Sequence, residues 1–549
     1  MSKVVTKAPG GEQDLNRWDG VTPTFTRLTS TGSTITLRKV GYEVDAVQSY
    51  GGGVNFNSAT ITSALTAIGT SNKVTLVLAP GTWTIATALT IPANITLKVP
   101  GGAILTKSGS GTMAINGPFE AGQYKVFFDF SAGNITFGQK QPYYLCEWWG
   151  GTGDGATDNL VPIQCQHDSI PAAGGKMLFP GNDYRISGAI DITKPVEITS
   201  ASTTNAAAIV TTSATANIFV IACDNGVYIH DISLDYTTTR SAGSAIRVSG
   251  ATAGTINTYS RFSRLRFGVT NPGYVHINFM ASGYWTVREN MFHGATYAIY
   301  IQNIVDADAG DNTIEGNTFT YGTTSGCYAI HQDSCSGLRI INNKVIGFEF
   351  AYDMNLQETS GVLVIVGNSF EGSGTSAIRL AQGVAGAITN SVIITGNEIA
   401  GAANFVRMDA GTTAWIKYFA ITGNTYFFME AAGTAILLNG GEVGTITGNT
   451  LHGAIAGSPN GTGINIGSQT VNANVANNTL AGFTTPIICA STTSVINHTL
   501  SGGMTFAQLP AQAANGSLIY VSDGTIASPV AGSGPGCLAK RLAGAWVGN

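Results

Sequence analysis

A short phrase repeats down the second half of the chain, and its period constrains the fold more than any other feature. The phrase places aliphatic residues before Gly-Asn or Asn-Asn, then one further residue and an apolar one. The Asn residues that close these pairs, with Asn290 opening the series, are Asn290, Asn317, Asn343, Asn368, Asn397, Asn424, Asn449 and Asn478. The steps between them are 27, 26, 25, 29, 27, 25 and 29 residues. A nearly constant period of this length indicates a solenoid of stacked coils.

The Gly-Asn pairs predict sharp bends between strands, because Gly and Asn are the residues that best tolerate a positive φ. If successive coils stack, the Asn side chains meet at one bend. Their amides can then hydrogen-bond to each other along the axis of the stack, as amide ladders do. We therefore expect a structural role for these Asn residues.

Composition supports an all-β chain of considerable size. The 549 residues include 70 Gly, and only 11% of them are charged, while 44% are hydrophobic. Long amphipathic helical patterns are absent, and Thr, Val and Ile are plentiful, which favours strands. The low charge content excludes a disordered chain, and the net charge of −5 provides no basic surface for nucleic acid.

Export and membrane signals are missing from the sequence. No apolar run approaches the roughly 18 residues of a membrane helix, so we expect no membrane insertion. Residues 1–20 contain no apolar core of a signal peptide. Seven scattered Cys residues form no CxxC pair, and we expect them to be reduced and mostly buried, as in a protein made in a cytoplasm.

Two similar units precede the repeats. Residues 1–40 are polar and are predicted to form an arm or attachment segment, followed by an N-terminal β domain over residues 41–145. In the first unit, Ser58 is expected to cap a helix from Thr60 to Ile68. The second unit begins with Gly-Asp-Gly-Ala-Thr-Asp at 153–158 and continues with a helical stretch to Ile170. A helix at this place can cover the open end of a β-stack.

The start of the second unit resembles a known group of proteins. Glu147-Trp148-Trp149-Gly150, the 153–158 segment and the turn Pro180-Gly181-Asn182-Asp183-Tyr184 look like the start of the pectate-lyase-like right-handed parallel β-helix proteins, which include many phage tailspikes. The resemblance implies three parallel sheets, a short capping helix and often a homotrimer. It covers residues 146–500. Residues 501–549 are predicted to form a separate C-terminal β module that resembles terminal modules of phage tail proteins.

Each repeat contains another strand before its Asn bend. Apolar and polar residues alternate along this strand, so its first and third residues are expected to point inward and its second and fourth outward. Gln332 is an exception to the apolar inward rule. One outward column contains Arg247, His276, Tyr300, His331, Asp353, Arg379, Arg407, Leu437 and Asn465, and the other contains Ser249, Asn278, Gln302, Asp333, Asn355, Ala381, Asp409, Asn439 and Gly467. With strands about 4.8 Å apart, these columns predict a polar strip about 40 Å long.

Such a strip fits an extended polysaccharide, which needs aromatic faces and bidentate hydrogen-bonding groups. We expect Tyr300, His331, Asn355, Arg379 and Arg407 to bind substrate. A merely solvated sheet face would also be polar, so this alternative stays open.

Hydrolysis of a glycosidic bond requires two carboxyl groups. Asp333 and Asp353 lie on adjacent rungs, and ideal strand geometry separates them by roughly 8 Å. That distance falls in the window of about 6.5–9.5 Å for an inverting enzyme, in which a water molecule fits between the two groups. Both carboxylates are expected at the surface, Arg379 should keep Asp353 ionised, and Asp409 is a third catalytic candidate.

The sequence thus predicts a phage tailspike-type protein of the virion tail, synthesised in the host cytoplasm, that binds and cleaves a bacterial surface polysaccharide. It would work without a cofactor or metal, and its other partners would be tail or baseplate proteins. The segment from Asp306 to Asp311 resembles half of a calcium loop but lacks the later Glu.

Three alternatives remain at this stage. A receptor-binding or structural tail protein would use the same scaffold without turnover. A polysaccharide lyase would use His331, Arg379 and Arg407 on a uronic-acid glycan. A bacterial polysaccharide-active enzyme is disfavoured, because no export signal is visible.

Overall fold

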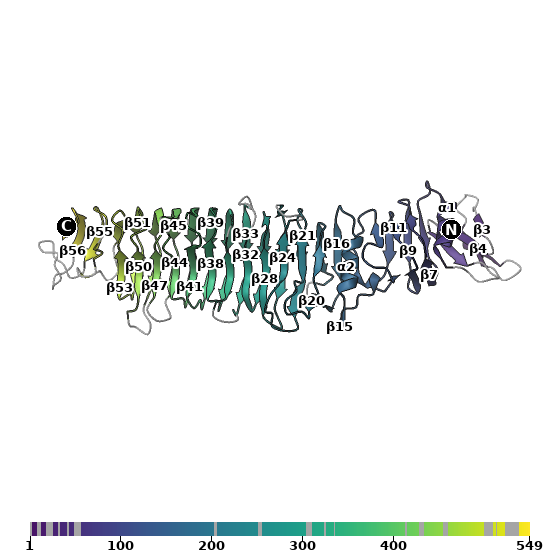
Figure 1. Ribbon diagram of the computed structural model, residues 1–549, viewed down its shortest axis with the longest axis horizontal. Coiled ribbons are helices and arrows are strands. Elements are labelled where there is room, and N and C mark those ends of the chain that lie inside the picture. The colour runs from purple at the N-terminus through teal and green to yellow at the C-terminus, as the bar shows by residue number, and fades with distance from the viewer. Residues whose placement is uncertain are drawn as a thin grey trace. The chain divides into compact units, whose positions relative to one another are not determined.

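The predicted all-β parallel β-helix is confirmed by a computed structural model (Figure 1). The structure describes residues 56–548, except 203–205, 251–254, 303–309, 323–325, 334, 412–413, 428–432, 454–458, 499–504, 506–508, 512 and 522–536, together with the backbone of five strands between residues 3 and 48. The chain divides into two compact units, Met1–Ala208 and Ile209–Asn549. The domain limits predicted at residues 40, 145 and 500 remain predictions.

The first unit contains short parallel strands preceded by antiparallel ones. Strands β1 and β2 pair with each other, and β3, β4 and β5 continue into the parallel strands β6, β9 and β12. The bounds are β1 Lys3–Lys7, β2 Gln13–Arg17, β3 Thr26–Ser30, β4 Ser33–Val40, β5 Glu43–Gln48, β6 Val74–Val77, β7 Gly81–Ile85, β8 Leu89–Ile91, β9 Ile95–Val99, β10 Ala103–Lys107, β11 Met113–Ile115, β12 Phe119–Ala121, β13 Phe127–Phe128, β14 Ile135–Phe137, β15 Asp154–Asp158, β16 Gly175–Phe179, β17 Asp183–Ile186, β18 Ile190–Ile192 and β19 Val196–Ser200.

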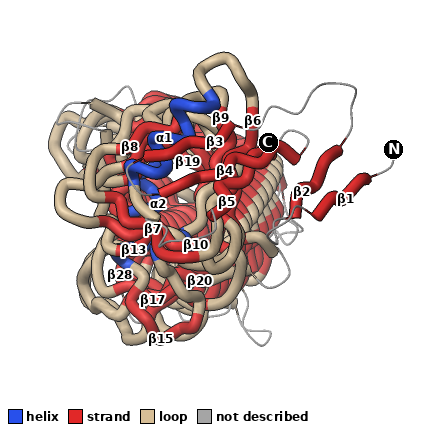
Figure 2. Tube along the Cα trace, turned by 90° about the vertical axis from the view of Figure 1, so that its right-hand side faces the viewer, coloured by secondary structure: helices blue, strands red, loops and turns tan. Residues whose placement is uncertain are grey.

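The α-helices α1 (Ser58–Ile68) and α2 (Leu160–Ser169) both belong to this unit (Figure 2). The predicted cap of α1 is displaced by one residue, because the Asn57 side chain, and not that of Ser58, accepts the hydrogen bond from the Thr60 backbone N–H at 3.0 Å. Helix α2 packs against β14, β18 and the 3-10 helix η1 (Cys146–Trp149). No helix in the described part of the chain is long and apolar enough to cross a bilayer.

The two motifs of the family resemblance touch each other in this unit. The Tyr184 hydroxyl, from the Pro-Gly turn, donates a hydrogen bond to the Glu147 carboxylate. Trp148 and Trp149, which follow Glu147, are both buried among aromatic rings. The motifs therefore act as parts of one packed junction, which explains why they occur together in the sequence.

The second unit consists of coils that each contribute one strand to each of three parallel sheets (Figure 1). The first sheet contains β22 Tyr228–His230, β26 Arg261–Ser263, β30 Thr286–Arg288, β33 Asn312–Glu315, β36 Gly337–Ile341, β39 Ser360–Val366, β42 Thr389–Thr395, β45 Ile416–Thr422, β48 Gly441–Thr447, β51 Ala473–Ala476, β54 Val495–His498, β55 Leu518–Val521, β56 Cys537–Leu542 and β57 Ala545–Gly548.

The second sheet contains β20 Ala208–Thr211, β23 Ser233–Tyr236, β27 Arg266–Phe267, β31 Met291–His293, β34 Thr318–Thr320, β37 Lys344–Ile346, β40 Ser369–Glu371, β43 Glu398–Ala400, β46 Thr425–Phe427, β49 Thr450–His452 and β52 Thr479–Ala481. The third sheet, which carries the predicted site, contains β21 Phe219–Ala222, β24 Ser244–Ser249, β28 Gly273–Phe279, β32 Ala295–Ile301, β35 Tyr328–Gln332, β38 Phe350–Leu356, β41 Ser376–Gln382, β44 Asn404–Met408, β47 Thr434–Leu438, β50 Thr462–Ile466 and β53 Thr485–Cys489. The short strands β25 Asn257–Thr258 and β29 Ser282–Gly283 pair separately.

The end of the chain forms the expected small β module. Strand β55 pairs in parallel with β54, and β56 and β57 then follow as antiparallel strands. Val521, Cys537 and Ala539 form a small buried cluster there, against which Trp546 packs. None of the seven Cys residues forms a disulfide, and all of them are buried, in agreement with the expectation of buried thiols.

The predicted Asn ladder is present at the bend between the first and second sheets. The side-chain Nδ2 of each Asn from Asn290 to Asn449 donates to Oδ1 of the next Asn at 2.8–3.0 Å. Each acceptor oxygen also receives the backbone N–H of the preceding Asn, at 2.8–3.1 Å. The eight side chains are at most 3% exposed. Their amides are hydrogen-bonded in full, as burial of polar groups requires.

The bend itself is made by the residue before each ladder Asn. That residue has a φ between 53° and 68° at all eight bends. Gly occupies the position in five of them, and a Cβ added at Gly396 or Gly423 would contact nothing within 4 Å. At these two bends the preference for Gly is therefore conformational, because the positive φ and not a lack of space disfavours other residues. At Gly367, a Cβ would in addition lie too close to Asn342 Oδ1.

We expect Asn397→Ala to lower the free energy of unfolding by about 2–4 kcal/mol, because it leaves buried donors on Asn368 and a buried acceptor on Ile365 without partners. The matched control is Asn390→Ala, which truncates an exposed Asn of strand β42. This control should change stability by less than about 0.5 kcal/mol. Chemical denaturation of both variants measures the difference, and equal losses would contradict a stabilising ladder.

Candidate functional site

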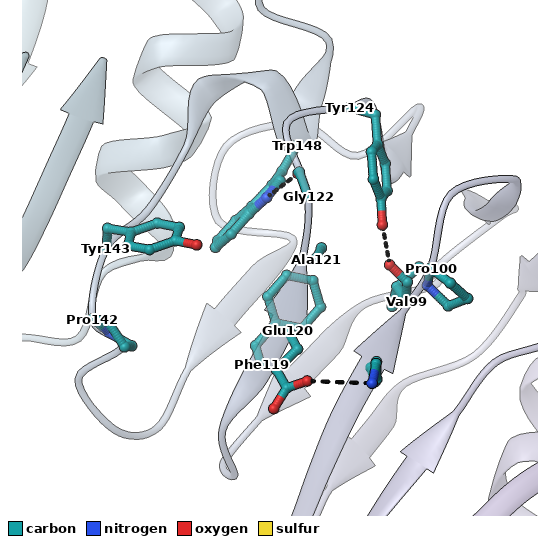
Figure 3. Close-up of a pocket in the computed structure, with 11 residues that line it drawn as sticks. Val99, Pro100, Phe119, Glu120, Ala121, Gly122, Tyr124, Pro142, Tyr143 and Trp148 are labelled. Carbon is teal, nitrogen blue, oxygen red and sulfur yellow. Dashed lines mark hydrogen bonds and ion pairs between the residues drawn. The ribbon is translucent and has the colours of Figure 1, made fainter. Parts of the chain in front are cut away.

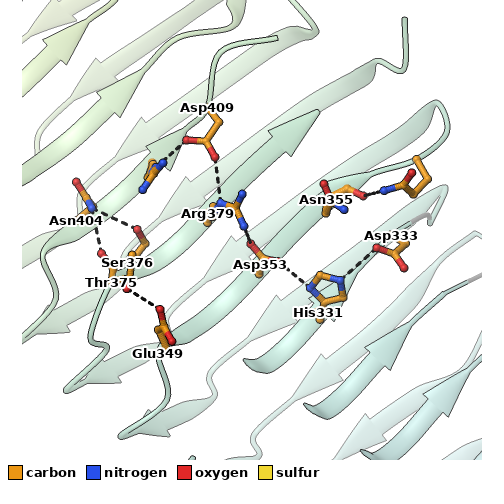
Figure 4. A network of polar contacts seen from close by, with 12 residues as sticks. His331, Asp333, Glu349, Asp353, Asn355, Thr375, Ser376, Arg379, Asn404 and Asp409 are labelled. Carbon is orange, nitrogen blue, oxygen red and sulfur yellow. Dashed lines mark hydrogen bonds and ion pairs between the residues drawn. The ribbon is translucent and has the colours of Figure 1, made fainter. Parts of the chain in front are cut away.

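The predicted polar column lies on the solvent side of the third sheet, on the adjacent strands β32, β35, β38, β41 and β44. Tyr300, His331, Asp353, Arg379 and Arg407 are direct register partners along these strands. Asp333 and Asp409 follow the ends of β35 and β44. Figure 4 shows the charged side chains of this face directed toward one another across the strands. We call this surface the outer wall.

Three side chains at the start of the wall form a continuous chain of contacts. The Tyr300 hydroxyl donates to Asp333 Oδ2 at 2.7 Å. His331 Nε2 lies 3.2 Å from Asp333 Oδ1, and His331 Nδ1 lies 2.7 Å from Asp353 Oδ2. The second contact is an ion pair without hydrogen-bond alignment, since neither of its atoms has an aligned partner among the described residues. One imidazole thus bridges two carboxylates.

The chain of contacts continues through two arginines. Arg379 Nη1 lies 3.2 Å from Asp353 Oδ1, and Arg379 Nε donates to Asp409 Oδ2 at 3.0 Å. Arg407 Nε donates to the other oxygen of Asp409 at 2.6 Å. Acidic and basic groups therefore alternate along the wall. We call the set Tyr300, Asp333, His331, Asp353, Arg379, Asp409 and Arg407 the polar chain.

Burial differs sharply among the three carboxylates. The side chains of Asp333 and Asp409 are 18% and 22% exposed, whereas that of Asp353 is only 1% exposed. The expectation of a surface carboxylate was therefore wrong for Asp353, because His331 and Arg379 contact its two oxygens and cover it. The imidazole also occupies the space between Asp333 and Asp353 in which a water molecule was expected.

The two carboxylates determine the charge of His331. Burial alone would lower the pKa of His331, but its contacts with Asp333 and Asp353 and the attraction of their charges raise it to about 9. His331 is therefore an imidazolium at neutral pH. The pKa of Arg379 is also raised, since attraction to Asp353 and Asp409 outweighs the lowering by burial. Three carboxylates are thus balanced by two guanidinium groups and one imidazolium.

Aromatic rings form one flank of the polar chain. Tyr297 stacks on Tyr328 with ring centroids 5.0 Å apart and on Tyr300 at 4.9 Å. Tyr328 stacks in turn on Phe350 at 5.1 Å, and its ring lies 4.9 Å from that of His331. The tyrosine rings are partly exposed, so they present aromatic surface beside the charged groups.

Tyr328 and Phe350 were missed in the sequence, although they were detectable. Together with Tyr297 they occupy the position three residues before Tyr300, His331 and Asp353. Strict alternation assigns that position to the core side. In the structure two consecutive residues face inward at this point, for example Ala298 and Ile299, which are both fully buried. This irregularity brings both Tyr297 and Tyr300 to the outer side.

The predicted outward column contains one error, at His276. Arg247 pairs in register with Asn278, and Asn278 pairs with Tyr300, so Asn278 belongs to the column. His276 is fully buried, with its ring near those of Phe267 and Phe292, and burial lowers its pKa to about 3. A shift of two residues preserves the alternation of faces, so the apolar pattern could not detect the wrong register. His276 itself is buried because it and Ile277 are two consecutive inward residues, level with Ala298 and Ile299 on the next strand.

The side-chain amides of Gln332 and Asn355 differ in their hydrogen bonding. Gln332, the exception to the apolar inward rule, is 1% exposed, and its side-chain oxygen accepts from the Tyr352 hydroxyl at 2.6 Å. The half-buried side-chain amide of Asn355 makes no hydrogen bond with any residue that the structure describes, and it lies on the same wall (Figure 4). The hydrogen bond drawn at Asn355 runs from the Gln357 side chain to the backbone oxygen of Asn355. The side-chain amide of Asn355 is therefore available to a ligand. The calcium-like loop falls largely on residues 303–309, which lie outside the described residues.

Comparisons with known proteins return similarities of fold. No family model and no curated protein matches the chain. Among solved structures, the A-module of mannuronan C-5 epimerase AlgE6 from Azotobacter vinelandii is 15% identical, with 65% of this chain and 98% of that chain covered and a TM-score of 0.46. ORF18 of Geobacillus virus E2 is 15% identical over 73% and 69%, with a TM-score of 0.37. The gp42 tailspike of Acinetobacter phage vb_AbaP_AS12 is 12% identical over 73% and 74%, with a TM-score of 0.40.

We expect the stability of the protein to fall as pH rises through the pKa of His331. The folded-state pKa of about 9 lies above the ordinary value of 6.5, so the stabilisation is complete below about pH 6.5 and is lost toward pH 9. This pKa shift of His331 corresponds to a decrease of about 3 kcal/mol in the free energy of unfolding. Denaturation of the wild type and of His331→Gln across this range measures it. The variant should lack the loss, and identical profiles for the two proteins would contradict the imidazolium.

Proposed function

We propose that this chain binds a bacterial surface polysaccharide along the outer wall and cleaves it by hydrolysis, as a tailspike-type protein of a phage tail. The observation that carries the proposal is the polar chain with its aromatic flank on a single exposed sheet face. Sugars combine apolar C–H faces, which pack on aromatic rings, with hydroxyl groups, which bind charged side chains. The repeat of the strands extends this face in one direction, as a long glycan requires.

The charge of the wall supports a neutral stretch of glycan as the bound segment. Every carboxylate of the polar chain already contacts a cation, and Arg379 is bonded at both Asp353 and Asp409. A uronate would therefore find each cation of the polar chain already paired with a carboxylate. Sugar hydroxyls, in contrast, can bind at the partly exposed edges of Asp333, Asp409 and Arg407 without breaking an ion pair.

The proposed reacting groups are His331 and Asp333, because they are an acid and a base of the network in direct contact, with side chains that keep 11% and 18% exposure. His331 Nε2 donates a proton to the glycosidic oxygen as the bond to the anomeric carbon breaks. Asp333 takes a proton from the water molecule whose oxygen bonds to that carbon. After the reaction, Asp333 returns its proton to His331 Nε2, which lies 3.2 Å away, and the starting state is restored.

Asp353 acts in this proposal as a positioning residue and not as a base. Its buried carboxylate holds His331 Nδ1, which leaves Nε2 directed toward Asp333, as a buried Asp orients His in catalytic triads. Arg379 links this pair to Asp409 and to Arg407. Asp409 lies three strands beyond Asp333, about 14 Å away, which is too far for a catalytic pair of carboxylates. We therefore assign Tyr300, Asn355, Arg407 and Asp409 to substrate binding.

The short spacing of His331 and Asp333 favours β-elimination as a second candidate. In elimination, the proton removed and the oxygen released are on neighbouring ring carbons, so acid and base can be close together. In hydrolysis, the two groups flank the sugar at about 5–9.5 Å, so the proposed mechanism requires the bound glycan to separate Asp333 from His331 Nε2. The neutralised arginines argue against elimination, since a lyase needs a cation at the uronate. The products distinguish the reactions, because elimination alone gives an unsaturated sugar that absorbs in the ultraviolet.

We expect Asp333→Asn to reduce the release of oligosaccharides from host capsule or lipopolysaccharide by about 10²–10⁴-fold, because the proton acceptor is lost. The matched control Glu398→Gln, at an exposed position on the second sheet, should retain activity. Asp353→Asn should also reduce release, but with a loss of stability of about 3–5 kcal/mol from uncompensated buried charge.

Full activity of Asp333→Asn would refute the mechanism. Binding of the polysaccharide by the wild type without release would favour the non-catalytic receptor-binding role.

The tail location and homotrimeric assembly follow from the sequence resemblance, with other tail or baseplate proteins as partners. We expect sedimentation equilibrium of the purified chain to give three times the mass of a single chain, and the mass should not change on dilution across the micromolar range. A single-chain mass would remove the trimer from the proposal. It would leave the chemistry of the wall unaffected, because every residue of the polar chain comes from one chain.

A further inference from the structure

A second concave site lies in the first unit, between strands β9 and β12 and the segment that leads into η1 (Figure 3). Its volume of about 350 Å³ falls in the range of about 300–1,000 Å³ that is usual for small-molecule sites. The residues that line the pocket include Lys98, Phe119, Glu120, Tyr124, Tyr143 and Trp148. None of them belongs to the polar chain.

The aromatic walls of this pocket are held in place by hydrogen bonds. The Tyr124 hydroxyl donates to the Val99 backbone oxygen at 2.6 Å, and Trp148 Nε1 donates to the Gly122 backbone oxygen at 3.1 Å. The Phe119 ring packs edge-on against Trp148, with centroids 4.8 Å apart. The pocket therefore exists before a ligand binds, which reduces the entropic cost of binding.

One aromatic side chain and one pair of opposite charges remain accessible in the pocket. The Tyr143 ring is 39% exposed and lies 6.3 Å from that of Trp148. Lys98 Nζ and a Glu120 carboxylate oxygen lie 3.9 Å apart, and both side chains are partly exposed. Figure 3 shows Glu120 and Tyr143 on different sides of the open space. A ligand in the pocket thus meets an aromatic face together with a donor and an acceptor.

We propose that this pocket binds one or two neutral pyranose rings as an auxiliary, non-catalytic glycan site. A pyranose has an apolar C–H face for Tyr143 and equatorial hydroxyl groups that both donate to Glu120 and accept from Lys98. The charges of Lys98 and Glu120 cancel, so an ionised ligand gains nothing over a neutral one. The inference rests on the proposed function in one respect, which is that glycans are the ligands of this chain.

The test measures binding of the full chain to the methyl glycosides of glucose, galactose and N-acetylglucosamine by saturation-transfer NMR. Tyr143→Ala should weaken binding of the preferred sugar by about tenfold, and Tyr143→Phe should retain it, because the ring and not the hydroxyl is the contact. Tyr418→Ala, which removes a tyrosine that is 63% exposed in the second unit, is the matched control and should bind like the wild type. Glu120→Gln, which loses a charged acceptor, should weaken binding without a loss of stability.

Oligosaccharide release separates this inference from the proposed function. Tyr143→Ala should bind the methyl glycosides more weakly but cleave soluble polysaccharide at the wild-type rate, whereas Asp333→Asn should cleave nothing. If Tyr143→Ala binds the sugars as well as the wild type does, the auxiliary site is refuted, and the polar chain keeps its proposed role. If none of the three sugars binds to the wild type, the pocket is refuted as a neutral-sugar site whatever the outcome of the cleavage assay.

Discussion

The Asn ladder is the constraint on which the other features of the second unit depend. Each ladder oxygen accepts two hydrogen bonds from the preceding Asn, one from its backbone and one from its side chain. A coil that slipped by one residue would leave a buried amide without partners, at a cost of about 1–3 kcal/mol for each group. The ladder thus sets the vertical register of the coils. Because the coils are in register, side chains from distant parts of the sequence become neighbours on the third sheet.

The sequence was sufficient for the architecture and for most of the outer wall. The Gly-Asn pairs predicted the bends and the ladder, and the aliphatic rows predicted the register from Tyr300 to Arg407. The register error at His276 arose because a two-residue shift leaves the predicted alternation unchanged. His276 is buried because it is one of two consecutive inward residues. Tyr328 and Phe350 were missed because the strands place two consecutive residues in the core. Such an irregularity depends on the closure of the coil and is not encoded in local alternation.

The burial of Asp353 could not be predicted for a different reason. Outward direction follows from alternation, but exposure depends on the length and conformation of neighbouring side chains. His331 and Arg379 flank Asp353 on the adjacent strands, and both are long enough to reach over it. Charge attraction then draws them onto its oxygens. The spacing of carboxylates read from strand geometry was reasonable for backbones, but it did not include the imidazole between them.

The polar chain is difficult to explain by stability alone. Apolar residues of similar size generally stabilise a buried position as well as an ion pair does, because the charges lose hydration on burial. The same column continues with Leu437, which pairs in register with Arg407, and the coil there is built in the same way without a charge. The fold therefore does not require charged residues in this column. In a chain with only 11% charged residues, a balanced row of acids and bases around a buried Asp353 therefore supports the proposed ligand-binding role of this column.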